Sequence, residues 1–300
     1  YTRGSLCGKC TLAYNGAFLD PKLRLANPLR RVGDKGTGQF ETVTWDEALD
    51  SISAKLKEIT DDNPAKILHA HYTGTCSLIA NKFPMRFFNK LGATEVEPDT
   101  VCNMAGHIAL EQLIGTSLVG FDPRTSKDSH SIFVWGANPS ATAPHAHQYW
   151  LKESNAKIIV IDPVRHQTAE KADLHLQLRP GSDAALAFSL MHVLIHENAL
   201  DEEFIENYTI GWDELLPKVL LCNPEWGAKH TGLKRDDIIK AAKIYAEGPS
   251  LLWLGQGLQR QRLGGNIIRS CAILPAITGN FSKPGSGLLY LNGSGRMGVD

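Results

Sequence analysis

A cysteine close to small residues and a histidine marks the stretch of this sequence best suited to chemistry. Cys102 lies in Asp99-Thr100-Val101-Cys102-Asn103-Met104-Ala105-Gly106-His107. Three roles are open to it: a buried structural thiol, a nucleophile activated by a base, or a thiolate ligand to a soft metal. His107, five residues on, is poorly placed on a helix to serve as that base. Ala105 and Gly106 leave space for a bulky cofactor.

Four predicted strands are followed by residues that suit a nucleotide. These residues are Gly136-Ala137-Asn138-Pro139, Asp162-Pro163, Arg179-Pro180-Gly181-Ser182-Asp183 and Gly255-Gln256-Gly257. Ligands of an open parallel sheet bind outside the carboxyl ends of its strands. Each pattern alone is typical of turns, but four in one sheet indicate a nucleotide cofactor. No G-x-G-x-x-G opens a helix, so this is not the standard NAD fingerprint.

Two further groups carry weaker signals. The segment Leu6-Cys7-Gly8-Lys9-Cys10 places two thiols near a lysine. Three interpretations are open: the thiols are half of a metal site, they form a redox pair, or they have no chemical function. His145-Ala146-His147 either lines a phosphate or pterin site or lies on a surface helix. Cys222 and Cys271 have no chemical context, so we expect inert thiols.

Helices and strands alternate along the chain and would position these residues. Residues 1–40 are expected to be loop-like, and Thr44 with Glu47 forms a capping box that starts a helix. Residues 67–70 are expected to form a buried strand and residues 77–91 a helix. Further strands are predicted at 132–135, 157–161, 175–178, 251–254 and 287–291, a turn or short helix at 168–172, and helices at 104–114, 147–154, 183–197, 201–208, 235–247 and 264–278. This alternation predicts a parallel sheet covered on both faces.

Composition excludes some classes of protein. The 300 residues are 43% hydrophobic and 21% charged, and the net charge is −1. We therefore expect no nucleic-acid partner. No apolar run approaches the length of a membrane span. The six cysteines are too scattered for a disulfide framework. Because the sequence begins at Tyr1 without Met, we expect it to be an N-terminal fragment of a longer protein.

An ordered series of motifs then points to a family. The motifs are Gly4-Ser5-Leu6-Cys7-Gly8-Lys9, residues 24–33 (RLANPLRRVG), Val43-Thr44-Trp45-Asp46-Glu47-Ala48, Trp135-Gly136-Ala137-Asn138-Pro139, Val160-Ile161-Asp162-Pro163, Thr168-Ala169, Ala172-Asp173, residues 179–186 (RPGSDAAL), Thr278-Gly279-Asn280 and Lys283-Pro284-Gly285. The sequence resembles the catalytic subunits of the dimethyl sulfoxide reductase superfamily. These molybdenum or tungsten enzymes carry bis(molybdopterin guanine dinucleotide), and they include formate dehydrogenase, periplasmic nitrate reductase and acetylene hydratase.

The resemblance implies a role for each matching residue. Cys102 would be the protein ligand to Mo or W, and Cys7 the last of four cysteines that hold a [4Fe–4S] cluster, the other three lying upstream. Lys9 would lie between cluster and pterin and help electrons pass, whereas Cys10 would not be a ligand. Cys102, Lys9 and His107 are the catalytic candidates. The cofactor-binding candidates are Lys9, Gly136, Asn138, His145, Asp162, Pro163, Thr168, Asp173, Gly181, Asp183, Gly255, Gln256, Gly257 and Arg260.

The resemblance also implies an activity with open alternatives. The expected reaction is a two-electron exchange with a small-molecule substrate, as in anaerobic respiration, with electrons passing through the cluster to an iron–sulfur partner subunit. Formate dehydrogenases have Arg two residues before the metal ligand and His directly after it, where this sequence has Thr100 and Asn103. The alternatives are a non-redox hydratase of the acetylene hydratase type and a cofactor-less relative in NADH:quinone oxidoreductase.

The implied architecture is α/β and discontinuous. Residues 1–25 would be the remnant of an iron–sulfur domain, and residues 26–98 the first half of an α/β domain. Residues 99–290 would form a Rossmann-like domain with a parallel sheet that binds the guanine dinucleotide, and residues 291–300 would return to the preceding domain. A cytoplasmic location is the default expectation, and export is expected if a twin-arginine signal lies upstream.

Overall fold

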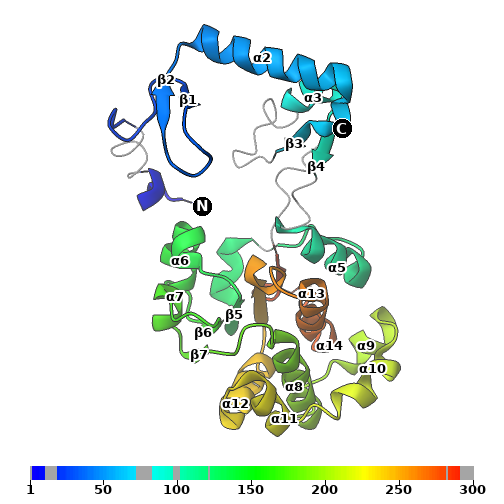
Figure 1. The fold of residues 1–300 in the computed structure, drawn as a ribbon. Coiled ribbons are helices and arrows are strands. Elements are labelled where there is room, and N and C mark those ends of the chain that lie inside the picture. The colour runs from blue at the N-terminus through cyan, green and yellow to red at the C-terminus, as the bar shows by residue number, and fades with distance from the viewer. Residues whose placement is uncertain are drawn as a thin grey trace. The chain divides into compact units, whose positions relative to one another are not determined.

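The computed structural model describes residues 2–10, 19–71, 83–96, 102–120, 122–281 and 283–290 (Figure 1). The chain divides into two compact units. The smaller unit contains the described residues from 2 to 96, and the larger unit contains those from 102 to 290. Each unit is considered by itself below. The division into four segments made from the sequence stays a prediction.

The smaller unit contains a hairpin that the sequence did not predict. Strands β1 (Leu29–Arg31) and β2 (Phe40–Thr42) pair antiparallel. The expectation of a loop throughout residues 1–40 is therefore wrong at β1 and at Phe40, and it is also wrong at residues 8–10, which are helical. Two glycines with positive φ, Gly36 and Gly38, let the chain reverse between the strands. Strands of three residues are too short for an alternating pattern to reveal them.

Helix α2 (Trp45–Asp62) confirms the predicted capping box. The Thr44 hydroxyl accepts from the Glu47 backbone N–H at 3.2 Å, and the Glu47 carboxylate accepts from the Thr44 N–H at 2.8 Å. Together these bonds satisfy amides at the start of the helix. No residue of α2 is buried, and Trp45 is 66% exposed.

Two short parallel strands and a helix complete the smaller unit. They are β3 (Leu68–Ala70), α3 (Phe83–Leu91) and β4 (Thr94–Val96), with a 3₁₀ turn η1 (Pro64–Lys66) before β3. The predicted strand at 67–70 is present, but its expected burial is wrong, because Leu68 is 62% exposed and only one face is covered. The predicted helix at 77–91 is observed from Phe83, and its first six residues lie outside the described residues.

The larger unit is built on five parallel strands. In the order of the sheet they are β7 (Leu174–Leu176), β6 (Lys157–Ile161), β5 (Ser131–Trp135), β8 (Ser250–Leu254) and β9 (Gly287–Leu289). This confirms the expected α/β class with a parallel sheet. The chain runs outward from β5 through β6 to β7, and it then returns to the other side of β5 for β8 and β9.

Helices surround the sheet of the larger unit. They are α5 (Met104–Ile114), η2 (Pro123–Asp128), α6 (Pro139–Thr142), η3 (Ala146–Leu151), α7 (Gln167–Glu170), α8 (Asp183–His196), α9 (Glu202–Tyr208), α10 (Trp212–Val219), α11 (Pro224–Thr231), α12 (Arg235–Ala246), η4 (Gln256–Leu258), α13 (Gly264–Ala272) and α14 (Leu274–Ile277). The predicted helix at 264–278 is two helices, because Pro275 lacks the N–H that would continue α13. The predicted helix at 147–154 is a π-helical turn, η3, and helices α10 and α11 were not predicted.

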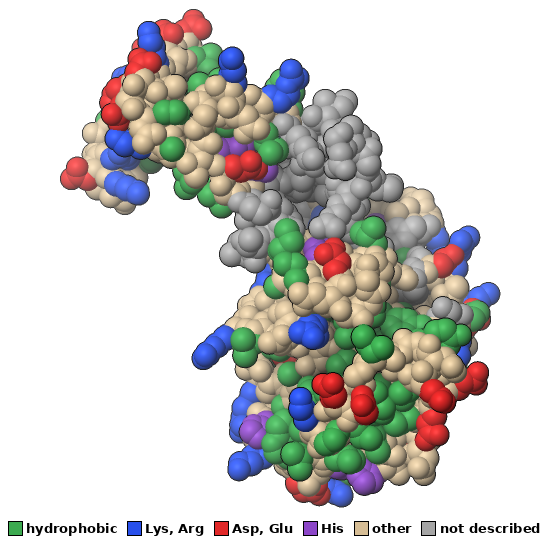
Figure 2. Space-filling model, turned by 90° about the vertical axis from the view of Figure 1, so that its right-hand side faces the viewer, with side chains coloured by type: hydrophobic (Ala, Val, Ile, Leu, Met, Phe, Trp, Pro, Cys, Tyr) green, Lys and Arg blue, Asp and Glu red, His purple; other side chains and the backbone are tan. Residues whose placement is uncertain are grey.

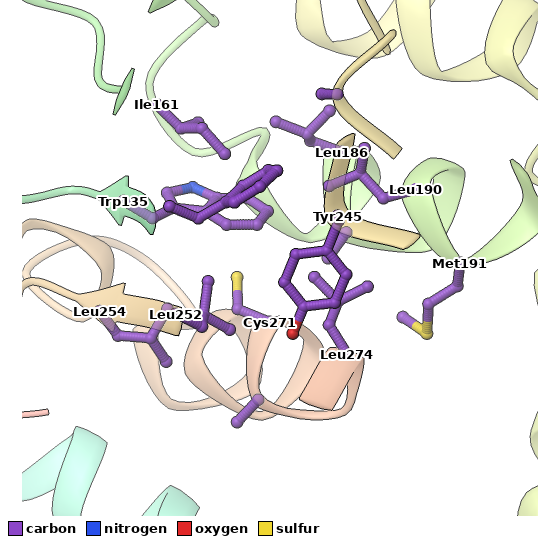
Figure 3. Packing of buried hydrophobic residues seen from close by; sticks show 14 of the residues in the cluster. Trp135, Ile161, Leu186, Leu190, Met191, Tyr245, Leu252, Leu254, Cys271 and Leu274 are labelled. Carbon is purple, nitrogen blue, oxygen red and sulfur yellow. The ribbon is translucent and has the colours of Figure 1, made fainter. Parts of the chain in front are cut away.

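The two faces of the sheet are covered unequally. Alternate strand residues, among them Phe133, Trp135 and Leu252, join residues of α5, α8, α12 and α13 in one large core (Figure 3). Tyr245 of α12 meets Phe133 edge to face at 5.1 Å. Burial raises the pKa of the Cys271 thiol in this core, which fits the expected inert thiol. The opposite face, which includes Val134, packs against η3 and α7 in a smaller cluster.

One side of the larger unit exposes apolar side chains. Figure 2 faces the side on which α9 and α10 lie, and it shows green hydrophobic side chains bordered by red carboxylates. Tyr208, Ile210 and Leu221 are among the exposed residues there. Within the part of the chain that the structure describes, no helix has the length and apolar character needed to cross a membrane.

Candidate functional site

The candidate site is centred where the strand order reverses. Neighbouring strands β5 and β8 are followed by loops that run in opposite directions across the sheet, and such switch points are where open α/β sheets bind ligands. The N–H of Gly255 donates to the carbonyl of Trp135 at 2.7 Å, and that of Gly257 donates to the carbonyl of Gly136 at 3.1 Å. The predicted glycine-rich strand ends are therefore brought together.

Glycines allow these two loops to touch through their backbones. Gly136 has φ +64°, a conformation that side chains disfavour. A Cβ atom on Gly255 would lie 2.1 Å from the Gly136 carbonyl oxygen, and one on Gly257 would lie 2.8 Å from it. Both distances are below van der Waals contact. The two loops therefore pack closely through their backbones.

The loop after β5 holds a small polar network. The Ser140 hydroxyl donates to the Asn138 side-chain carbonyl at 2.6 Å, and the Ser140 N–H donates to the Thr168 hydroxyl at 3.1 Å. That hydroxyl also lies 3.3 Å from His147 Nδ1. Burial first, and then the charge of Lys171, lowers the pKa of His147. Asn138 and Thr168, predicted from separate motifs, are therefore neighbours on one edge.

Asp162 follows β6 on the same edge. Its Oδ1 accepts from the Val164 N–H at 2.8 Å, and its Oδ2 lies 3.9 Å from His166 Nε2. The carbonyl of Pro163 accepts from the Gln177 side chain at 2.9 Å. Burial lowers the pKa of His166, and the charge of Asp162 opposes that shift. The Asp162 side chain is 15% exposed at the end of the strand.

Asp183 lies inside the site rather than on its surface. It is 5% exposed at the start of α8, and burial raises the pKa of its carboxyl group. Its two oxygens accept from the Trp135 indole N–H at 2.9 Å and from Gln261 at 3.1 Å. Asp183 thus fastens together β5, α8 and the loop after β8. Gly181, with φ +85°, lies close to Gln261 as well.

Two predicted cofactor contacts are placed differently. Asp173 precedes β7, and its carboxylate accepts from the Ile158 N–H at 2.7 Å, near the amino end of β6. The structure therefore does not bring Asp173 to the carboxyl edge of the sheet. Asp173 and Thr168 both line a cavity of about 300 Å³. His145 lies at the start of η3, with its ring 6.4 Å from that of Tyr149. The nucleotide roles of Asp173 and His145 stay predictions.

Cys102 is held by the loop that follows β8. The Gln259 side chain donates to the Cys102 carbonyl, and its own carbonyl accepts from the Gly106 N–H at 2.7 Å. Arg260 reaches the same residue, with Nε 3.4 Å from the Cys102 carbonyl oxygen and Nη2 3.5 Å from its sulfur. Nη2 also donates to the side chain of Gln256. The candidate metal ligand is thus placed against the switch-point loop.

His107 points into the interior beside this cysteine. It is 3% exposed, and its Nε2 lies 2.9 Å from the Asn103 side-chain amide. Its ring meets Tyr290 edge to face at 5.5 Å. The Tyr290 hydroxyl donates to the Asn103 carbonyl at 3.4 Å. His107 therefore packs α5 against the end of β9, and its catalytic role stays a prediction.

Cys7 and Lys9 belong to the smaller unit. The backbone N–H groups of Cys10 and then Lys9 lower the pKa of the half-buried Cys7 thiol. Thiolates are the form in which cysteines bind metals. Among the residues that the structure describes, no three His, Cys, Asp or Glu side chains gather into a metal-binding group. The side chains of Cys7 and Cys10 interact, so the smaller unit holds a pair of neighbouring thiols.

Sequence reasoning missed the residues that support Cys102. Gln259 is 6% exposed, and it joins α5 to the loop after β8 across 153 positions. Gln261 performs the same task for Asp183. The alternating run Gln259-Arg260-Gln261 was a usable signal, since two amides beside a glycine-rich strand end suit backbone bonding.

Comparisons with known proteins agree with this geometry. The family model described as molybdopterin oxidoreductase matches residues 24–297. The probable oxidoreductase YoaE of Bacillus subtilis is 36% identical over 298 residues, which cover 97% of this chain and 43% of YoaE. The F420-dependent formate dehydrogenase 1 subunit alpha of Methanococcus maripaludis is 33% identical, and the match covers 95% of this chain and 42% of that subunit.

A solved structure of a molybdopterin enzyme has a similar fold. Acetylene hydratase from Pelobacter acetylenicus superposes with a TM-score of 0.71 at 29% identity, covering 97% of this chain and 39% of the hydratase. The chain thus spans about two fifths of the length of these relatives. The resemblance seen in the sequence is confirmed: the chain belongs to the molybdopterin oxidoreductase family.

Proposed function

We propose that this chain is part of the catalytic subunit of an oxidoreductase that binds Mo or W through bis(molybdopterin guanine dinucleotide) and Cys102. The observation that carries the proposal is the position of Cys102. It lies against Gln259 and Arg260 of the switch-point loop, in a chain of the molybdopterin oxidoreductase family. When bound, the cofactor supplies a metal that exchanges two electrons with a small substrate.

The residues at the switch point fit such a group. A thiolate is a suitable ligand for a soft metal, and Cys102 is half-buried rather than sealed in the core. Gly255 and Gly257 let the loop after β8 contact the backbone of Gly136, which brings the two glycine-rich strand ends together at the switch point. Gln259 fixes the Cys102 carbonyl, so the thiol is oriented before any ligand binds.

The guanine dinucleotide would bind along the edge formed by β5, β6 and the start of α8. Asn138 and Asp162 would offer an amide and a carboxylate to ribose or base, and Thr168 would fix the loop of Asn138 through Ser140. Gly181 would let the chain pass close to an anionic group at the start of α8. Asp183 would not contact the ligand. It would hold the loops of the site in place, because it accepts hydrogen bonds from Trp135 and Gln261.

Electron transfer would use the smaller unit. Cys7 would be one of the ligands to a [4Fe–4S] cluster, a role supported by the lowered pKa of its thiol. Lys9 would help electrons move between cluster and pterin, and an iron–sulfur partner subunit would exchange them. The [4Fe–4S] cluster and the iron–sulfur partner subunit are parts of the proposal.

A second function is favoured by the structural match. A non-redox hydratase would use the same fold and the same cysteine, and acetylene hydratase superposes on 97% of this chain. Turnover separates the two functions. An oxidoreductase requires an electron donor or acceptor, whereas a hydratase converts its substrate without one.

The test uses the full-length protein. We expect near-stoichiometric Mo or W by mass spectrometry and GMP released on acid hydrolysis. Cys102→Ser should lower activity at least about 100-fold. Cys222→Ser is the matched control, because the half-buried Cys222 thiol lies just after α10, outside the candidate site, and donates to the Lys218 carbonyl. A protein without Mo, W and pterin, or full activity in Cys102→Ser, would overturn the proposal.

A further inference from the structure

Helices α8, α9 and α10 enclose a groove on the surface of the larger unit, called here the α9–α10 groove. Its volume is about 510 Å³, and apolar side chains from all three helices line it, among them Ile195, Ile205, Trp212 and Leu216. Ile195, Ile205 and Trp212 also pack against the large core. The groove is therefore built into the fold, and its lining is largely apolar.

Two strongly exposed apolar side chains lie in the segment that joins α9 to α10. Tyr208 is 75% exposed and Ile210 is 100% exposed. Ile210 lies two residues before Trp212, which lines the groove. Figure 2 shows apolar side chains gathered on this side of the larger unit. A single exposed apolar residue is ordinary, but apolar residues gathered beside a groove are typical of a surface that binds another polypeptide.

The segment that forms the groove is strongly acidic. Residues 201–221 contain six carboxylates and one lysine, which is a net charge of −5, whereas the whole chain carries −1. Asp201 caps α9 and lies 3.9 Å from Lys283. The other five carboxylates are exposed, and none forms an ion pair with a described residue: Glu202, Glu203, Glu206, Asp213 and Glu214. An uncompensated negative charge thus accompanies the apolar groove.

Helix geometry does not explain the carboxylate of Glu206. Glu202 and Glu203 lie in the first turn of α9, where the helix dipole favours negative charge. Glu206 lies in the last turn, where the dipole disfavours it. Glu206 also follows Glu202 by four residues, so the two like charges repel each other on one face of α9. Both line the groove, and a cation bound between them would relieve this repulsion.

We propose that the α9–α10 groove binds a segment of another protein in which lysine or arginine residues flank bulky apolar side chains. The apolar side chains would fill the groove, and the cations would pair with Glu202 and Glu206 at its rim. A second copy of this chain would bring the same carboxylates to a symmetric interface. Charge complementarity therefore selects a basic partner. This inference does not depend on the proposed function.

The test uses the full-length protein and fluorescent peptides of defined composition. The first peptide has leucines at helical spacing and lysines at the other positions. In the second, glutamates replace the lysines, and in the third, serines replace the leucines. We expect the lysine–leucine peptide to bind at least about tenfold more tightly than either of the others, measured by fluorescence anisotropy.

Two results with these peptides would overturn the proposal. If the lysine–serine peptide binds as tightly as the lysine–leucine peptide, charge alone accounts for binding and the groove takes no part. If the lysine–leucine peptide does not bind, the groove is closed to a basic partner, as it would be if another part of the full-length protein covered it.

Matched variants locate the binding site. Glu202→Gln combined with Glu206→Gln should weaken binding of the lysine–leucine peptide about fivefold. Glu170→Gln removes an exposed carboxylate at the end of α7 and should change binding less than about twofold. Ile210→Ser should weaken binding about threefold, whereas Val164→Ser, at a 62% exposed position after β6, should not. Equal losses in the groove variants and their controls would overturn the proposal.

Crosslinking and the oligomeric state complete the test. A benzophenone in place of one leucine should attach the peptide to α9 or α10, as mapped by mass spectrometry, and attachment elsewhere would contradict the proposal. Light scattering of the full-length protein should show no dimer that Ile210→Ser dissociates. Such a dimer would mean that a second copy covers the groove. None of these measurements involves the metal or GMP content, so the two proposals can fail separately.

Discussion

The two units of this chain bury their apolar side chains to very different extents. In the larger unit, Trp135, Phe133 and Leu252 are fully buried between sheet and helices. In the smaller unit, α2 has no buried residue, although Trp45, Leu49 and Ile52 recur at helical spacing. The larger unit therefore has a core of its own. The apolar stripe of α2 is not covered by the described residues from 2 to 96.

The two units show that some helices are fixed by neighbouring residues and others by contacts with residues far away in the sequence. The capping bonds of Thr44 and Glu47 fix where α2 begins without any packing. By contrast, the position of α8 depends on Asp183, which bonds to Trp135 and Gln261 far away in the sequence. That residues 26–98 are half of a discontinuous domain stays a prediction, and the exposed stripe of α2 agrees with it.

The largest effect is expected in the core of the larger unit. Trp135→Ala removes a fully buried ring and one donor to Asp183, so the free energy of unfolding should fall by about 3–5 kcal/mol. Trp135→Phe keeps most of the volume and should cost only about 1–3 kcal/mol. Chemical denaturation of the full-length protein measures both. Equal losses in the two variants would show that the hydrogen bond, not the packing, dominates.

A smaller loss is expected at the switch point. Gly255→Ala places a Cβ 2.1 Å from the Gly136 carbonyl oxygen, so the two loops must separate, at a cost of about 1–3 kcal/mol. The GMP content of the purified protein should fall too. Gly265→Ala in α13 is the matched control, because its Cβ would lie 3.2 Å from the Ala105 carbonyl oxygen of α5. If both variants retain GMP, the close contact of the loops does not shape the site.

The pH dependence of stability should include His166. Because burial lowers its folded pKa below the usual 6.5, the unfolded state takes up the proton first as the pH falls. The contribution of His166 is thus present above about pH 6.5 and lost as the pH falls through the folded pKa. His166→Asn keeps a side chain able to cap α7 and should lose less stability between pH 7.5 and 5.5, by urea unfolding. The charge of His166 also lowers the pKa of His147, so the measured difference includes a smaller change at His147 in the same direction. Identical pH profiles would contradict this assignment.

The smallest effect is expected in the smaller unit. Ile52→Ala should change the free energy of unfolding by less than about 0.5 kcal/mol if the stripe of α2 is uncovered. Leu190→Ala in the core of the larger unit should cost about 2–5 kcal/mol. Comparable losses in the full-length protein would mean that another part of that protein covers α2.

Much of the fold could be predicted because its causes are local. Apolar runs of four or five residues, closed by Gly-Ala-Asn-Pro or Asp-Pro, predicted β5 and β6 within one residue. The order of the strands could not be predicted, since nothing in β8 itself says that it pairs with β5. The split between α13 and α14 had a visible cause in Pro275, and the regular apolar spacing concealed it.

The candidate site was predictable only as a set of strand ends. Gly136, Asp162 and Gly255 each follow a strand of a parallel sheet, so their common edge follows from the fold class. Asp173 comes directly before β7, and a residue in that position lies at the amino edge of a parallel sheet. The contact of Arg260 with Cys102 joins residues 158 positions apart, and no local pattern encodes it.

Ligation of the metal by Cys102 is the central claim, and X-ray absorption at the Mo or W edge tests it most directly. The measurement compares full-length wild-type protein with Cys102→Ser, which keeps a ligand of similar size. The account predicts that the variant loses one sulfur from the metal's ligand shell and gains an oxygen. The same sulfur shell in both proteins would contradict it.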